Sequence, residues 1–209
     1  MPSTEISLRA ASLRGVVYIA ALAGLMQGIL LIDAHAATGP NFSEVSMTEI
    51  TQAVLLLLCA SSMLYVRRRL RVIPTLTLLL WAFFSASFVR ENDLWLDTYL
   101  FDGAWQALVA LIIIPVLVTV IRSRRDLARE FSQISNTFGF GLFAAGFLTT
   151  YIFSRLYGRT ELWQSMMGES YLRVVKDAAE ELTELTGYCL LLFACIEIVL
   201  LARRMRDRQ

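Results

Sequence analysis

The last long apolar stretch of the chain, residues 185–202, reads LTGYCLLLFACIEIVLLA and is followed directly by Arg203 and Arg204. An α-helix of this length extends about 27 Å, which nearly matches the roughly 30 Å hydrocarbon core of a bilayer. Glu197 is its single charged residue. The stretch therefore predicts a transmembrane helix that ends at a basic, water-exposed boundary.

The rest of the 209-residue chain has the same character, with 56% hydrophobic and 18% charged residues. Soluble domains contain about 45–50% apolar residues even when glycine is counted. We predict six spans in a single integral membrane domain, residues 1–209, at about 15–36, 50–66, 72–89, 104–121, 134–156 and 182–202. Because lipid offers the backbone no hydrogen-bond partners, these spans should be helices, and the fold class is an all-α polytopic bundle.

The distribution of charge predicts the orientation of this bundle. Of the 19 basic residues, 14 fall in the N-terminal tail, in the links after the second and fourth spans, and in the C-terminal tail. Six spans place these segments on one side, which the positive-inside rule assigns to the cytoplasm, together with both termini. We therefore expect a multi-pass protein of the bacterial inner (plasma) membrane. A single lysine and no soluble basic domain argue against nucleic acid as a partner.

The first span has an alternative interpretation. Arg9 and Arg14, an apolar stretch, and then Ala34-His35-Ala36 imitate a secretory signal with a small-residue cleavage site. The stretch from Gly15 to Ile32 is longer than the 7 to 15 residues that are usual for a signal core, which favours a retained helix. Cleavage before Ala37 would leave five spans.

A first cluster of charged residues follows the third span and contains Arg90, Glu91 and Asp93. A charge at the edge of hydrocarbon is costly, so Arg90 should pair with a carboxylate or extend to the lipid head groups. This cluster is either one wall of a polar pocket or an interfacial cap in which Asn92 begins a short helix.

A second cluster is denser, and it leads directly into the last span. We predict an amphipathic outer helix, residues 169–184, that is continuous with this span. Spacings of four residues predict ion pairs between Glu169 and Arg173, between Arg173 and Asp177, and between Lys176 and Glu180. Asp177, Glu181 and Glu184 form a stripe, and at its depth Glu184 should face protein or water rather than lipid. The alternative is a solvated helix surface.

Asp33 and His35 lie at the outer end of the first span, at the same membrane level as the two clusters. His35 is the only histidine, which excludes a three-histidine zinc site. Carboxylates suit a divalent cation such as Ca²⁺, Mg²⁺ or Mn²⁺, or a proton. The candidate metal ligands are Glu91, Asp93, Glu181 and Glu184.

These residues predict an outward-facing acidic pocket that binds or transports an ion or a small polar solute. Its expected ligand-binding residues are Asp33, His35, Arg90, Glu91, Asp93, Asp177, Glu181 and Glu184. One alternative is an accessory subunit that docks another membrane protein through its acidic outer face and through the fifth span, which contains Gly139, Gly141 and Gly146. A second alternative is an enzyme acting on a lipid at the outer leaflet, although the chain shows no Ser/His/Asp arrangement.

Overall fold

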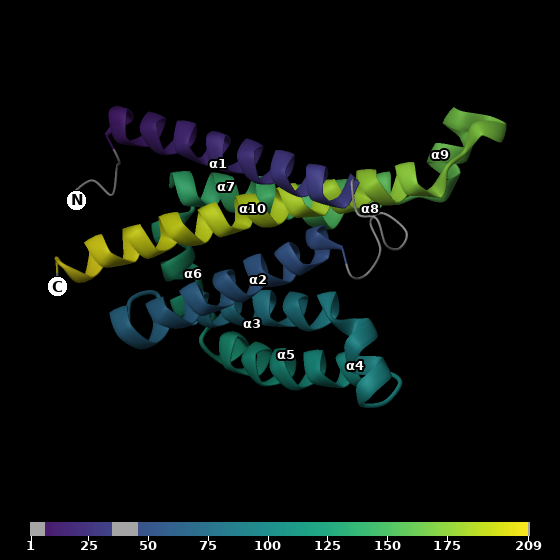
Figure 1. Cartoon of the computed structure of the whole chain (residues 1–209). Coiled ribbons are helices and arrows are strands. Elements are labelled where there is room, and N and C mark those ends of the chain that lie inside the picture. The colour runs from purple at the N-terminus through teal and green to yellow at the C-terminus, as the bar shows by residue number, and fades with distance from the viewer. Residues whose placement is uncertain (1–6, 35–45, 209) are drawn as a thin grey trace. The chain divides into compact units, whose positions relative to one another are not determined.

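The computed structural model describes residues 7–34 and 46–208, and this part of the chain is helical without strands (Figure 1). It divides into two compact units. Within the described residues, unit 1 contains 53–141 and 192–208, and unit 2 contains 7–34, 46–52 and 142–191. Three helices run from one unit into the other: α2 (Met47–Tyr65), α7 (Phe138–Leu148) and α10 (Arg173–Arg206).

In the described residues, four helical segments are long and apolar enough to cross a membrane. They are α1 (Leu8–Ala34), α2 extended by the π-helical turn η1 (Val66–Leu70), α5 (Ala104–Arg122) and α10. The pair formed by α6 (Arg124–Ile134) and the segment Phe138–Tyr157 gives a fifth if it is counted as one span, although it is bent by 105°. The all-α class is thus confirmed, and four to five helices have the length and apolar composition that a membrane span requires. The predicted count of six spans is not confirmed, because the third predicted span, 72–89, is not among these helices.

Helix α1 is apolar around its whole circumference, and most of its large side chains are exposed. The exposed ones include Leu13, Val16, Val17, Ile19, Leu31 and Ile32. A helix that is apolar on every face needs an apolar surrounding, and lipid provides it.

The third predicted span, 72–89, begins later than expected. Its helix, α3 (Pro74–Glu91), starts after a turn in which Arg71 and Ile73 have left-handed backbone angles, with φ of 58° and 44°. Pro74 occupies the first helical turn, where its missing N–H leaves no hydrogen bond unmade. The predicted boundary was wrong because apolar Val72 and Ile73 belong to the turn rather than to the helix.

The fifth predicted span, 134–156, is not one continuous helix. Helix α6 ends at Ile134 and α7 begins at Phe138, after which come the π-helical turn η2 (Thr149–Phe153) and α8 (Ser154–Tyr157). The apolar composition of this stretch does not reveal these breaks.

The outer helix predicted over 169–184 also begins later. Helix α9 (Thr160–Met167) ends at Gly168, whose φ of +56° favours glycine, and the 3₁₀ turn η3 (Gly168–Ser170) follows. Helix α10 starts only at Arg173 and then continues without a break into the last span. Glu169 and Arg173 therefore do not share a helix, and the expected four-residue pair between them was wrong.

In unit 1, α3 and α5 lie side by side and α6 packs against both (Figure 1). Ala82, Val116 and Val120 form a buried cluster, against which Trp81 and Leu127 pack. Glu130 of α6 is buried, and its Oε2 accepts the backbone N–H of Leu76 at 2.7 Å. A carboxylate at a helix N-terminus satisfies a donor that has no partner inside the helix, so Glu130 fixes the start of α3.

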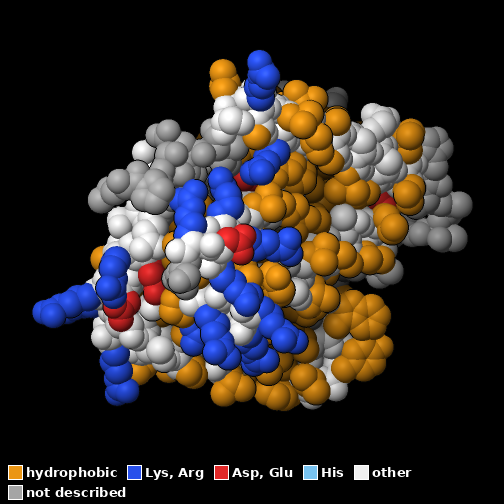
Figure 2. Space-filling view, turned by 90° about the vertical axis from the view of Figure 1, so that its left-hand side faces the viewer, with side chains coloured by type: hydrophobic (Ala, Val, Ile, Leu, Met, Phe, Trp, Pro, Cys, Tyr) orange, Lys and Arg blue, Asp and Glu red, His pale blue; other side chains and the backbone are white. Residues whose placement is uncertain are grey.

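The arginine-rich segments of unit 1 meet at one end of that unit. Arg206 donates from Nη1 to the carbonyl oxygen of Arg69 at 3.2 Å, and the guanidinium of Arg203 lies 5.7 Å from the ring centre of Tyr65. Figure 2 shows a dense cluster of Lys and Arg side chains where this end faces the viewer. The exposed arginines of these segments are Arg68, Arg69, Arg71, Arg122, Arg124, Arg125, Arg129, Arg203, Arg206 and Arg208.

In unit 2, glycines bring α7 and η2 close to α10. A Cβ on Gly187 would lie 1.9 Å from Oγ1 and 2.7 Å from the backbone nitrogen of Thr150, and a Cβ on Gly146 would lie 2.9 Å from the Gly187 oxygen. Such close approach of two backbones is the use of small residues at membrane helix interfaces. Gly146 thus makes a close helix contact within the chain, whereas a Cβ on Gly141 would meet no atom within 4 Å, so Gly141 makes no close contact.

This packing predicts that Gly187→Ala lowers the free energy of unfolding by about 1–3 kcal/mol, because the added methyl group collides with the Thr150 backbone. Gly141→Ala is the matched control and should leave stability unchanged or slightly increased, since alanine is the better helix former. Thermal unfolding of both variants in detergent measures the difference. Equal melting temperatures would contradict the close contact.

Candidate functional site

The π-helical turn η2 in unit 2 sets the direction of the polar side chains that follow it. Ser154 donates a short hydrogen bond from Oγ to the carbonyl oxygen of Thr150, and Thr150 donates from Oγ1 to the carbonyl oxygen of Glu184 at 3.5 Å. Both side chains are buried. A π-helical turn inserts a residue into an α-helix and thereby changes which face the next residues occupy, and such turns are frequent at functional sites. Ser154 and Arg155 consequently meet α10.

Glu184 is the innermost charged side chain of this region, with only 4% of the side chain exposed. Its Oε1 accepts a hydrogen bond from Nη2 of Arg155 and lies 3.2 Å from Oγ of Ser154, whose single hydroxyl proton is shared between Glu184 and the Thr150 carbonyl oxygen. The expectation that Glu184 faces protein rather than lipid is confirmed. A buried carboxylate is tolerated where a cation and further donors satisfy it, and Arg155 and Ser154 are those groups.

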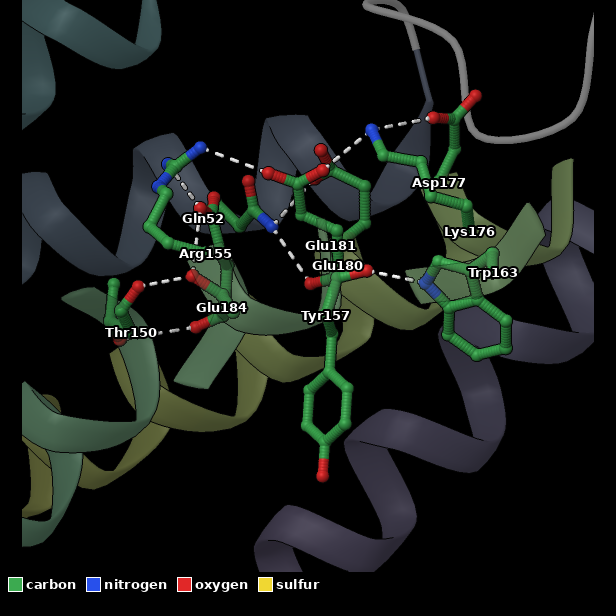
Figure 3. A network of polar contacts seen from close by, with 11 residues as sticks. Gln52, Thr150, Arg155, Tyr157, Trp163, Lys176, Asp177, Glu180, Glu181 and Glu184 are labelled. Atoms are coloured by element: carbon green, nitrogen blue, oxygen red, sulfur yellow. Dashed lines mark hydrogen bonds and ion pairs between the residues drawn. The ribbon is translucent and has the colours of Figure 1, made fainter. Parts of the chain in front are cut away.

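From Glu184, a chain of ion pairs leads along α10 to Asp177 (Figure 3) and on to the exposed Arg173 at the start of the helix. It is made by Arg155 Nη1 with Glu180 Oε1 at 2.9 Å, Lys176 Nζ with Glu180 Oε2 at 2.8 Å and with Asp177 Oδ1 at 3.1 Å, and Arg173 Nε with Asp177 Oδ2 at 3.4 Å. The exposed fraction of the carboxylate side chains falls from 27% at Asp177 to 15% at Glu180 and 4% at Glu184. We call these charged residues, with Gln52 and Glu181, the α10 network.

Gln52 joins the network from α2, and it is completely buried. Its Nε2 donates to Oε2 of Glu181 at 3.0 Å and to the backbone oxygen of Glu181 at 3.1 Å. If the amide were rotated so that its oxygen and nitrogen exchanged places, Oε1 would face the backbone oxygen and Oε2 of Glu181, neither of which donates a hydrogen bond. The two hydrogen bonds therefore fix the orientation of the amide. Within residues 7–34 and 46–208, Oε1 of Gln52 is the buried side-chain N or O atom that has no hydrogen-bond partner.

Three of the predicted site residues, Asp177, Glu181 and Glu184, are thus brought together in the α10 network. The predicted pairs of Arg173 with Asp177 and of Lys176 with Glu180 are confirmed. The network is not a solvated helix surface at its inner end, because Glu184 is buried.

Asp33 also lies in unit 2, where it has a structural role. Its side-chain oxygens accept the backbone N–H groups of Met47 at 2.9 Å and Thr48 at 3.0 Å, together with the Thr48 hydroxyl. This carboxylate caps the N-terminus of α2 from the end of α1 and is itself buried. His35 lies outside the described residues.

The first charged cluster belongs to unit 1. Arg90 and Glu91 end α3, and Asp93 begins α4 (Asp93–Tyr99), where its exposed side chain accepts the N–H of Leu94 at 2.7 Å. The side chain of Asn92 donates to the carbonyl oxygen of Phe88 at 2.8 Å, so Asn92 marks the helix boundary without capping α4 through its side chain. A pocket shared by this cluster and the α10 network stays a prediction.

Metal ligation receives no support from the described part of the chain. No three Asp, Glu, His or Cys side chains in residues 7–34 and 46–208 are arranged as a group that could hold a metal ion. In the α10 network, the carboxylates of Asp177, Glu180 and Glu184 already bind Arg and Lys side chains. These three carboxylates of the network are therefore bound by nitrogen cations that the chain itself supplies.

Four residues of this region were not predicted from the sequence as site residues: Gln52, Thr150, Ser154 and Arg155. Arg155 is one of five basic residues on the predicted outer side. Because a Glu184 side chain at membrane depth requires a cation, these five residues were the candidates for its partner. Gln52 is an uncharged polar residue in the second apolar stretch, which was a weaker signal. The π-helical turn that directs Thr150 and Ser154 has no recognisable sequence pattern.

Comparisons of the chain with protein-family models, with curated proteins and with solved structures find no match. A function must therefore be argued from the chemistry of the α10 network.

Loss of the innermost cation should destabilise the fold. Arg155→Ala leaves the buried Glu184 carboxylate without its charged partner, and we expect the free energy of unfolding to fall by about 1–3 kcal/mol. This range is below that of a fully buried pair because 44% of the Arg155 side chain is exposed. Arg173→Ala, which removes a cation that is 84% exposed, is the control and should change stability by less than about 0.5 kcal/mol.

Chemical unfolding in detergent micelles measures both values. If Arg155→Ala and Arg173→Ala lose the same stability, the buried end of the network does not differ from its surface.

Proposed function

We propose that this chain is a six-span protein of the inner membrane that binds or transports a small ion or polar solute through the α10 network. The spans would be α1, α2, α3, α5, the α7–η2–α8 segment and α10, with α6 lying along the cytoplasmic surface. Both termini would be cytoplasmic, as the arginines gathered at one end of unit 1 favour. The α10 network would then face the opposite, extracytoplasmic side.

The burial of the Glu184 carboxylate beside the partly exposed Arg155 carries this proposal. Removing a carboxylate from water costs several kcal/mol, and an apolar residue of similar size would pack this helix contact at least as well. Ionisable residues inside membrane-spanning segments commonly mark pathways for ions, protons or substrates. A site that exchanges its bound cation gives a physical reason for retaining charges here.

The decreasing exposure along α10 supports the same function. Arg173 is exposed, Asp177 and Glu180 are partly covered, and Glu184 is buried, so the exposure of the charged side chains decreases from the start of α10 toward the interior of unit 2. A solute could pass between these sites by successive exchange of ion pairs. A purely structural salt bridge would not require such a series.

The accessory-subunit alternative has less support from the glycines of the fifth span. Gly139 faces Glu197, with 3.0 Å between the position of its Cβ and the Cβ of Glu197, and Gly146 faces Gly187. Both contacts are made within the chain's own units, so these two surfaces are not open to a partner. A lipid-modifying enzyme remains the other alternative, and loss of lipid turnover in Glu181→Ala and Glu184→Ala would favour it.

The proposed topology predicts the outcome of reporter fusions. A fluorescent protein fused after Arg208 should fluoresce, and alkaline phosphatase fused there should be inactive, because both report a cytoplasmic C-terminus. Alkaline phosphatase fused after Asp102, between α4 and α5, should be active. Activity of the phosphatase fused after Arg208 would refute the orientation.

The proposed activity predicts that Glu184→Gln slows solute movement by about tenfold or more, because it removes the charge at the inner end of the route. Proteoliposomes would be assayed with protons, rubidium, methylammonium, acetate and glycerol as probes. Glu161→Gln, a charge change on the exposed side of α9, is the matched control and should retain the wild-type rate. Rates equal to those of protein-free liposomes for every probe, or an unchanged rate in Glu184→Gln, would refute the proposal.

A further inference from the structure

Three segments of unit 1, residues 66–76, 119–134 and 199–208, contain twelve arginines and no lysine. We call their exposed arginines the arginine surface, which is the dense cluster in Figure 2. Two hydrogen bonds join the three segments: from the Leu76 N–H to Glu130, and from Arg206 to the Arg69 carbonyl oxygen. The fold therefore concentrates charges of like sign, which repel one another unless an anion lies among them.

The chain itself neutralises little of this charge. The three segments contain three carboxylates, of which Glu130 is buried and accepts a backbone N–H. Within the described residues, the ion pair of Asp126 with Arg129 is the one that the arginine surface makes. The third carboxylate, Asp207, is exposed. A surface with such an excess of arginine over carboxylate attracts anions.

An exposed apolar face of α5 leads directly to the arginine surface. Ile114, Val118 and Arg122 are exposed and follow one another at spacings of four, so they lie on one face of the helix. Leu117 and Ile121, which are also exposed, widen the apolar part of this face. An apolar helix face requires an apolar surrounding, which acyl chains provide in a membrane. A ligand that fits both parts has apolar chains and an anionic head group.

Arginine side chains indicate the chemistry of that head group. The planar guanidinium donates two parallel hydrogen bonds to the oxygens of a phosphate. Clusters of about four to eight basic residues beside a membrane span are typical of sites for anionic lipids. A zwitterionic phospholipid carries the same phosphate together with a quaternary ammonium, which the arginines repel. The net negative charge of the head group is thus the property that this surface recognises.

We propose that the arginine surface binds the phosphodiester head group of an anionic phospholipid, whose acyl chains lie against the exposed face of α5. Arg122 and Arg125 bind the phosphate, because they lie at the junction of α5 with α6, directly after this face. The lipid neutralises the clustered arginines and holds α6 at the membrane surface. This inference shares with the proposed function the insertion of α5 into a membrane, but it requires no solute movement through the α10 network.

The test is a competition between two lipids that have the same acyl chains. The full chain in a mild detergent would receive equal amounts of dioleoylphosphatidylglycerol and dioleoylphosphatidylcholine, and native mass spectrometry would measure each bound lipid. We expect about tenfold or more bound phosphatidylglycerol, because each arginine near a membrane surface favours an anionic lipid severalfold. The double variant Arg122→Gln with Arg125→Gln should reduce this preference to about twofold or less.

The matched control removes the same charge elsewhere. Arg9→Gln with Arg159→Gln changes two exposed arginines outside the arginine surface and should keep the wild-type preference. Glycerol 1-phosphate, which is an anionic phosphate without acyl chains, should not displace the bound lipid at equal concentration. The melting temperature of each variant without added lipid reports folding, and the comparison of the two lipids on the wild-type protein requires no variant.

Four results would overturn the inference: equal binding of the two lipids to the wild-type protein, an unchanged preference in the Arg122 and Arg125 double variant, an equal loss of preference in the control, or displacement of the lipid by glycerol 1-phosphate. The last result would indicate a site for a soluble anion. Because lipid binding in detergent measures no solute movement, Glu184-dependent rates in proteoliposomes would in each case leave the proposed function standing.

Discussion

A carboxylate that lies within an apolar helix must find a cation and donors in the protein, and the Glu184 side chain imposes this constraint on unit 2. Arg155 and Ser154 satisfy it, but they reach Glu184 only because the π-helical turn at Thr149–Phe153 directs them toward α10. Gly146 and Gly187 permit the close approach that this contact requires. The π-helical turn, the two glycines and the ion pair therefore act together to make the burial of the Glu184 carboxylate possible.

The same constraint explains why the polar residues of unit 2 form a continuous network. Burial weakens solvation and strengthens the attraction between charges, so each innermost group depends on the next one outward. Glu180 binds both Arg155 and Lys176, and Asp177 binds both Lys176 and Arg173. Gln52 extends the network to α2, and its Oε1 has no hydrogen-bond partner among residues 7–34 and 46–208.

Two other buried carboxylates cap helices instead of forming ion pairs. In unit 1, Glu130 accepts a backbone N–H at the start of α3, and in unit 2, Asp33 accepts two at the start of α2. Both carboxylates thus replace hydrogen bonds that helix ends lack. Asp33 was predicted as a ligand-binding residue, since depth and charge alone cannot distinguish a capping carboxylate from a binding one. Only the hydrogen-bond partners of Asp33 make the distinction. They belong to the next helix, which begins at Met47, 13 residues after α1 ends at Ala34.

The sequence by itself determined the all-α class, the length and apolar composition of four to five helices that suit a membrane span, and the pairs of Arg173 with Asp177 and of Lys176 with Glu180. These depend on composition and on spacing within one helix, which are local properties. The tertiary structure alone decided that Glu184 meets Arg155, that Gln52 holds Glu181, and that the fifth apolar stretch is broken and contains a π-helical turn. Such contacts join residues between 29 and 129 positions apart, and they depend on which helix faces pack together, which no local pattern encodes.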